Sequence, residues 1–140
     1  MSSPNLNWIL GRHIRAVSLV DPSSWWFELE GGGTLRVDTL WRIVAAGRVA
    51  ATSADHGHRF GVPNPVNSAE CATRALADSA VRQASVTEDT GDVVLEFDNA
   101  TRLEILTTSS GYESWSIVSP TGDEAIGLGG GKVELLRRDA

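Results

Sequence analysis

One short segment of the chain combines residue types and a spacing that suit metal binding. Asp55 is followed directly by His56, and His58 lies two positions further on. Alternate residues of an extended chain face the same way, so these side chains could surround a divalent ion such as zinc, with His13 or a distant carboxylate as the fourth ligand. Two histidines in one loop are, however, far more often solvated or hydrogen-bonded. We therefore predict no metal site and keep Asp55, His56 and His58 as weak candidates.

The sequence contains no recognisable catalytic or cofactor-binding motif. Glycine triplets occur at 31–33 and 129–131, but neither opens a helix or carries the lysine and hydroxyl of a nucleotide-binding loop. The first triplet predicts a hairpin turn, and the second a bulge or turn where another backbone approaches closely. The single cysteine, Cys71, is interpreted as a small buried side chain on a helix. We predict no catalytic residue and no cofactor, and leave enzymatic activity open.

Aromatic and acidic residues in turns and loops indicate a surface that binds another protein. Trp25 and Trp26 are adjacent, so on a strand they face opposite sides, and we take Trp25 as the one available to a partner. Tyr112 and Glu113 lie in a loop that is longer in the second half of the chain, and Asp123 lies in a later turn. Trp25, Tyr112, Glu113 and Asp123 are the predicted partner-binding residues.

The strand pattern of the sequence predicts two related β-rich halves, about 10–52 and 80–136. Apolar residues of the first half recur 68 positions later, and a tryptophan-containing strand recurs 74 positions later. The matches are Phe27, Leu29, Leu35 and Val37 with Leu95, Phe97, Leu103 and Ile105, and Trp41-Arg42-Ile43-Val44 with Trp115-Ser116-Ile117-Val118. Between the halves, alanines at helical spacing predict a helix over about 68–77, capped by Asn67 or Ser68.

These patterns predict a single domain, residues 1–140, of mainly β structure. We expect two related antiparallel β-meanders that form a sandwich or a partly closed barrel, with one connecting α-helix. Because one meander buries only one of its faces, each half is expected to form one layer that the other half covers.

Composition and charge exclude several classes of partner. Hydrophobic residues make up 41% of the chain, as in a folded domain, and no apolar run is long enough to span a membrane. The net charge is −6, and residues 71–140 hold the whole excess. An acidic half repels nucleic acid and anionic membrane surfaces. A polar N-terminus without a signal peptide and a single cysteine favour a cytoplasmic location.

Several short motifs resemble a known family. They are Asp55-His56-Gly57, Phe60-Gly61-Val62-Pro63, Gly91-Asp92, Gly111-Tyr112-Glu113-Ser114-Trp115 and Gly129-Gly130-Gly131. They are similar to a family of small bacterial proteins described only as a domain of unknown function, with a Tyr-Glu-x-Trp segment, a downstream glycine cluster and two β-rich halves. The resemblance covers about residues 10–135 and implies no catalytic residue. In size and charge the chain is also similar to immunity proteins, which neutralise bacterial toxins by binding them.

Two functions therefore remain open. The first is a non-enzymatic protein-binding domain, with an immunity or accessory role, whose acidic second half and Tyr112 loop face the partner. The alternative is a small-molecule-binding or enzymatic domain with a pocket between the halves, lined by Trp41, Trp115 and the loop of His56 and His58. A homodimer through an open sheet edge is compatible with either.

Overall fold

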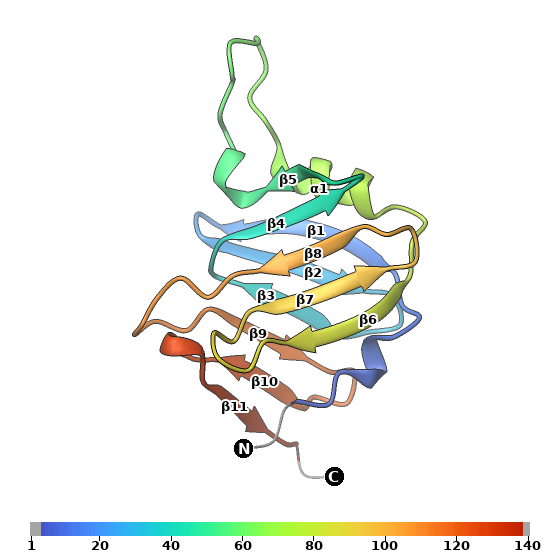
Figure 1. Cartoon of the computed structure of the whole chain (residues 1–140), viewed down its shortest axis with the longest axis vertical. Helices are drawn as coiled ribbons and strands as arrows, with labels where there is room; N and C mark the ends of the chain where they lie inside the picture. Colours follow the sequence, from blue (N-terminus) through green and yellow to red (C-terminus); the bar gives the residue numbers. More distant parts are fainter. Residues whose placement is uncertain (1–3, 139–140) are drawn as a thin grey trace.

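The chain folds into two antiparallel sheets that face each other (Figure 1), as a computed structural model describing residues 4–138 shows. The first sheet has the order β1 (Ile14–Asp21), β2 (Ser24–Leu29), β3 (Thr34–Val37), β9 (Trp115–Val118), β10 (Glu124–Gly127) and β11 (Val133–Leu136). The second has the order β5 (Arg48–Thr52), β4 (Trp41–Ala45), β8 (Arg102–Ile105), β7 (Val93–Phe97) and β6 (Val81–Val86). Short 3-10 turns are η1 (Asn7–Ile9), η2 (Ser53–Asp55) and η3 (Gly129–Gly131), and α1 is Ser68–Leu76. The predicted mainly β sandwich with one connecting helix is confirmed.

Each sheet takes strands from both halves of the sequence, so the expectation that each half forms one layer is wrong. The chain crosses from one sheet to the other between β3 and β4, and again between β8 and β9. As a result, Leu35 pairs with Ile117 in one sheet. Ile43 pairs with Leu103 in the other. The predicted repeat matches Leu35 with Leu103 and Ile43 with Ile117, so the two pairings are equivalent to each other under that repeat. The repeat itself stays a prediction.

The core lies between the sheets and is filled by alternate residues of the central strands. Trp41 is fully buried, and its ring meets the edges or faces of Trp25 and Phe27 at centroid distances of 5.2 and 5.1 Å. Such T-shaped contacts add specific geometry to apolar burial. The other large, fully buried side chains include Phe97, Trp115, Leu29, Leu35, Leu95, Leu103 and Ile105. Because buried and exposed residues alternate along these strands, the alternation of apolar and polar residues in the sequence predicts them.

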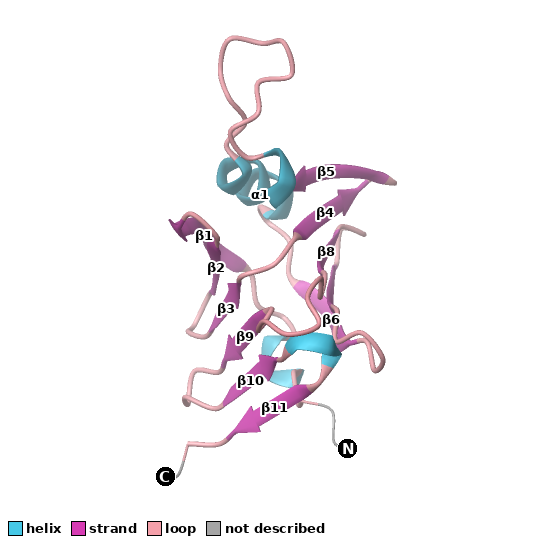
Figure 2. Cartoon of the chain, turned by 90° about the vertical axis from the view of Figure 1, so that its left-hand side faces the viewer, coloured by secondary structure: helices cyan, strands magenta, loops and turns pink. Residues whose placement is uncertain are grey.

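The helix α1 covers the edge of the sandwich where β1 and β5 end the two sheets (Figure 2). Its buried face presents Ala72 and Leu76 to the core. At its start, the Asn67 side chain accepts a hydrogen bond from the Glu70 backbone N–H, which confirms the predicted cap. None of the helices within residues 4–138 is both long and apolar enough to cross a membrane.

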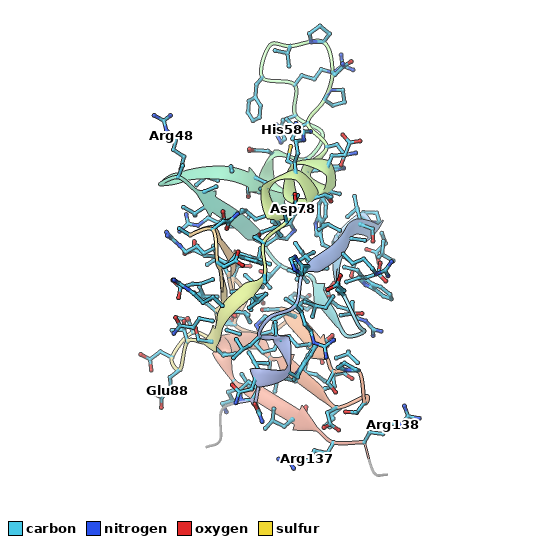
Figure 3. The ribbon with its side chains drawn as sticks, turned by 90° about the vertical axis from the view of Figure 1, so that its right-hand side faces the viewer. Arg48, His58, Asp78, Glu88, Arg137 and Arg138 are labelled. Atoms are coloured by element: carbon cyan, nitrogen blue, oxygen red, sulfur yellow. The ribbon has the colours of Figure 1, made fainter. Side chains whose placement is uncertain are left out.

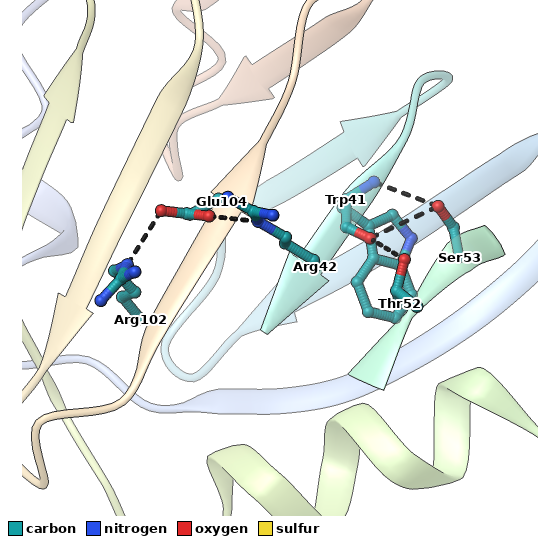
Figure 4. A network of polar contacts seen from close by, with 6 residues as sticks. All are labelled: Trp41, Arg42, Thr52, Ser53, Arg102 and Glu104. Atoms are coloured by element: carbon teal, nitrogen blue, oxygen red, sulfur yellow. Dashed lines mark hydrogen bonds and ion pairs between the residues drawn. The ribbon is translucent and has the colours of Figure 1, made fainter. Parts of the chain in front are cut away.

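A small ion-pair network lies on the outer face of the second sheet (Figure 4). Glu104 on β8 accepts hydrogen bonds from Arg42 on β4 and from Arg102, the latter at 2.8 Å. Its side chain is only 15% exposed. Partial burial by itself would raise the pKa of Glu104, but the hydrogen bonds and positive charges of Arg102 and Arg42 outweigh burial and hold that pKa below its ordinary value.

Replacing Glu104 with glutamine should destabilise the fold by about 1 kcal/mol at neutral pH, because the ionised carboxylate is the form that both arginines stabilise. Since the folded-state pKa is the lower one, this stabilisation is present above the unfolded pKa and is lost as the pH falls through the folded pKa. Urea unfolding of the wild-type protein and Glu104→Gln, from pH 7 down to pH 3, should therefore show a difference in the free energy of unfolding that becomes smaller in acid. Glu28→Gln, which weakens the more exposed Arg15–Glu28 pair, is the matched control and should change little. A difference in the free energy of unfolding that does not depend on pH would contradict stabilisation of the ionised Glu104 carboxylate by the two arginines.

Candidate functional site

Five connecting segments meet at one end of the sandwich, because β1, β3, β6, β8 and β10 all run towards it (Figures 1 and 2). The segments are residues 22–23, with the strand ends Asp21 and Ser24 beside them, and residues 38–40, 87–92, 106–114 and 128–132. We call this surface the acidic end. Its carboxylates are Asp21, Asp38, Glu88, Asp89, Asp92 and Glu113, and its basic residue is Lys132. Six carboxylates and one lysine give −5, most of the net charge of −6.

A shallow hollow in the acidic end brings Tyr112 and Glu113 together with residues from the first half of the chain. Asp21 and Asp38 line the same hollow. Ser24 donates a hydrogen bond from its hydroxyl to Asp38. Tyr112 is 82% exposed. The hollow therefore combines a large exposed aromatic ring with carboxylates, an arrangement suited to contact with a basic surface.

The second glycine triplet holds this surface together. A Cβ on Gly129 would lie 2.5 Å from the backbone of Gly111, and a Cβ on Gly131 would lie 2.6 Å from the backbone carbon of Thr90. These glycines therefore let two neighbouring loops approach η3 at backbone distance. The predicted close approach of another backbone is confirmed, and the loop that carries Tyr112 rests on it.

Two side chains tie the same loops to the core. The Trp115 indole N–H donates to the Gly91 carbonyl at 2.8 Å. The Asp92 carboxylate accepts the Thr107 backbone N–H at 2.8 Å. Gly91, Asp92, Trp115 and the triplet, quoted above as separate motifs of a family resemblance, thus form one structural unit. The unit supports the Tyr112 loop from beneath.

Replacing Gly131 with alanine should destabilise the protein by about 3 kcal/mol or more. Its φ of +100° is unfavourable for a side chain, and the added Cβ would press on the backbone of Asp89 and Thr90. Gly111→Ala is the control: a Cβ there meets nothing within 4 Å, so its free energy of unfolding should stay within about 0.5 kcal/mol. Equal stability of the two variants, measured by urea unfolding, would argue against close packing of Gly131 on the backbone of Asp89 and Thr90.

The other predicted partner-binding residues do not join this hollow. Trp25 is only 5% exposed and packs in the core, so taking it as the tryptophan available to a partner was wrong. The strand register turns Trp26 outward instead, where the Arg36 guanidinium covers its ring at 4.5 Å. Asp123 follows β9, whereas Glu113 precedes it, so the two carboxylates lie at opposite ends of that strand. Asp123 borders a separate groove of about 410 Å³ beside Trp8 and Leu135.

The weak metal candidates are not arranged around an ion. The His56 ring packs against Trp25 at 5.2 Å, and its Nδ1 accepts the Ser68 backbone N–H at the start of α1. His58 is exposed and stacks on Phe60 at 5.8 Å. Among residues 4–138, no group of three histidine, cysteine, aspartate or glutamate side chains has the geometry to hold a metal. His56 is therefore a structural residue that joins the loop to the helix.

His56→Ala should lower the free energy of unfolding by about 2 kcal/mol, because it leaves the N–H of the buried Ser68 without its acceptor and removes the ring from Trp25. His58→Ala serves as the comparison and should change it by less than about 0.5 kcal/mol. Chemical denaturation at pH 7.5 measures both. If His58→Ala were the more damaging variant, the structural assignment of His56 would be incorrect.

The pocket proposed between the halves is not formed by the residues expected to line it. Trp41 is 0% exposed and Trp115 is 2% exposed, so both indoles fill the core rather than border a cavity. The reason is the exchange of strands, which makes these residues partners of buried positions: Trp41 pairs with Ile105 and Trp115 with Val37. The placement of the pocket beside Trp41, Trp115 and the His56 loop was therefore wrong.

Sequence analysis missed the residues from the first half that complete the hollow, Asp21 and Asp38. Asp21 is the last residue of β1 and Asp38 directly follows β3, and neither position is distinctive when its turn is considered alone. The available signal was the direction of the strands: carboxylates that follow alternate strands of an antiparallel sheet collect at the same end. Using it required the pairing order, which the sequence did not supply.

The protein is therefore an antiparallel β-sandwich with an acidic, glycine-packed loop surface at one end. The chain belongs to a family of unknown function, DUF6188, whose profile matches residues 6–137. Comparisons with curated proteins and with solved structures gave no match. The family assignment confirms the resemblance inferred from the motifs.

Proposed function

We propose that this protein is a non-enzymatic binding domain whose acidic end docks onto a basic surface of another protein. The observation that carries the proposal is the exposed ring of Tyr112 in a hollow that Asp21, Asp38 and Glu113 line. The connecting segments at this end of the sandwich carry six carboxylates and one lysine in all. Opposite charges speed association and reject wrong partners, while an exposed aromatic residue supplies buried apolar area once the complex forms.

The rigidity of the acidic end supports the same function. The Tyr112 backbone N–H donates to the Ser109 hydroxyl at 2.9 Å. The neighbouring Gly111 rests on Gly129. A loop already held in one conformation loses little entropy when a partner binds it. Occlusion of a basic partner, as in an immunity or accessory protein, is the role that such a surface suits; a homodimer through a sheet edge stays a prediction.

The test begins with recovery of the partner from cells that carry the native gene, followed by binding measurements with the purified pair. Glu113→Lys combined with Asp21→Lys should slow association at least 10-fold in 50 mM salt, and the difference should shrink in 500 mM salt as the charges are screened. Tyr112→Ser should mainly accelerate dissociation.

Asp123→Lys is the matched control for this test, because it changes the charge equally but lies at the other end of β9. Association that is equally slow in Asp123→Lys would show that overall charge, and not the acidic end, guides binding. Association and dissociation rates that are unchanged in all of these variants would overturn the proposal.

A further inference from the structure

Residues 57–66 form a second unusual surface, which we call the apolar protrusion. It leaves the sandwich after η2, extends beyond the rest of the molecule and returns to the start of α1 (Figures 1 and 3). At its base, the Gly57 N–H donates to the Val66 carbonyl at 2.9 Å, and the Val66 N–H donates to the His58 carbonyl at 2.7 Å. The segment beyond these bonds projects into solvent.

The tip of the apolar protrusion exposes a concentrated set of apolar side chains. Phe60 is 67% exposed and Val62 is 55% exposed. Pro63 and Pro65, close by in the chain, are exposed as well. Single exposed apolar residues are ordinary on protein surfaces, but a phenylalanine, a valine and two prolines within six consecutive residues form a patch of the kind that marks an interaction site.

The tip is held in a defined conformation that costs free energy to maintain. Phe60 has φ = +49°, a left-handed conformation that disfavours large side chains. The Arg59 guanidinium donates to the Pro63 carbonyl at 3.0 Å, and the Val62 N–H donates to the Arg59 carbonyl at 2.9 Å. The Phe60 ring also stacks on the His58 ring, with the ring centroids 5.8 Å apart. These contacts keep Phe60 pointing away from the core instead of letting it collapse onto the domain.

Hydrogen bonds also hold the base of the apolar protrusion against the domain. The Ser68 hydroxyl donates to the Thr52 carbonyl at 2.7 Å, which joins the two ends of the segment, and His56 accepts the Ser68 N–H. The Thr52 hydroxyl in turn donates to the Trp41 carbonyl at 2.9 Å, so the base is tied to β4 (Figure 4). A convex apolar tip on a rigid base is pre-organised for insertion into a cavity.

We infer that the apolar protrusion inserts into a concave, apolar cleft of a partner protein, with Phe60 as the main anchor and Val62 beside it. The charged residue of the segment is Arg59, so the matching cleft carries acidic groups at its rim. A lipid surface fits less well, because a domain of net charge −6 with one arginine at the tip is repelled by anionic headgroups. The inference rests on the proposed binding of a protein but assigns a separate contact, apolar where the acidic end is charged.

Photo-crosslinking tests this contact directly. The photoreactive phenylalanine analogue p-benzoylphenylalanine would replace Phe60 in one variant, Tyr112 in a second and Ser85, on the outer face of β6, in a third as the background control. In cells that carry the native gene, the variant with the probe at position 60 should crosslink to one protein that mass spectrometry identifies, and the Ser85 variant should not.

Binding of that purified protein should then weaken at least 30-fold in Phe60→Ser and about 10-fold in Val62→Ser, because truncation of an apolar anchor removes most of its buried contact. Val49→Ser is the matched control, since Val49 on β5 is 54% exposed, close to the 55% of Val62, and should change the affinity less than twofold. Exposed positions of this kind leave folding intact, which circular dichroism and the unfolding midpoint verify for each variant.

The outcomes separate this inference from the proposed function. A crosslink at position 112 but none at position 60, or full affinity in Phe60→Ser, would overturn the inference and leave the acidic end as the docking surface. A crosslink at position 60 to a partner whose association rate is unchanged by charge reversal at Glu113 would support the inference and overturn the proposed function. The absence of a crosslink at both positions would overturn both. Crosslinking to a second copy of this chain, or Phe60-dependent sedimentation with phosphatidylcholine–phosphatidylglycerol vesicles, would overturn insertion into a partner protein.

Discussion

The structure depends on the pairing of strands from the two halves at the centre of each sheet. Leu35 pairs with Ile117 and Ile43 with Leu103, positions 82 and 60 residues apart in the chain. Neither half can complete a sheet without the other, because each contributes three strands to one layer and at least two to the opposite layer. The buried indoles of Trp41 and Trp115 sit on these central strands and secure the exchange through apolar packing.

The exchange also explains why a charged surface arises at one end of the molecule. Turns from the first half, at Asp21 and Asp38, lie beside loops from the second half that carry Glu113. Like charges this close repel one another, so the backbone that bears them must be held by other forces. Close contacts between Gly129 and Gly111, and between Gly131 and Thr90, supply that support without using any charged side chain.

The two proposed contacts use different physical chemistry. The acidic end offers long-range attraction, which is weakened by salt and governs the rate of encounter. The apolar protrusion offers Phe60 and Val62, whose burial acts only at contact and governs the lifetime of a complex. The apolar protrusion starts from the same end of the strands as the acidic end, since β5 ends beside the segments that form the acidic end. A partner that meets both surfaces would be oriented by the first and retained by the second.

Local features of the protein could be predicted from the sequence: alternation along the strands, the helix capped by Asn67, and the close approach at residues 129–131. Each depends on neighbouring residues or on backbone freedom that glycine alone provides. Three features came to light only in the folded structure: the halves exchange strands, Trp25 faces the core while Trp26 faces out, and Asp123 lies apart from Glu113. Period-2 patterning marks two faces of a strand but names neither its neighbours nor the direction in which it meets them, and those long-range pairings place the side chains.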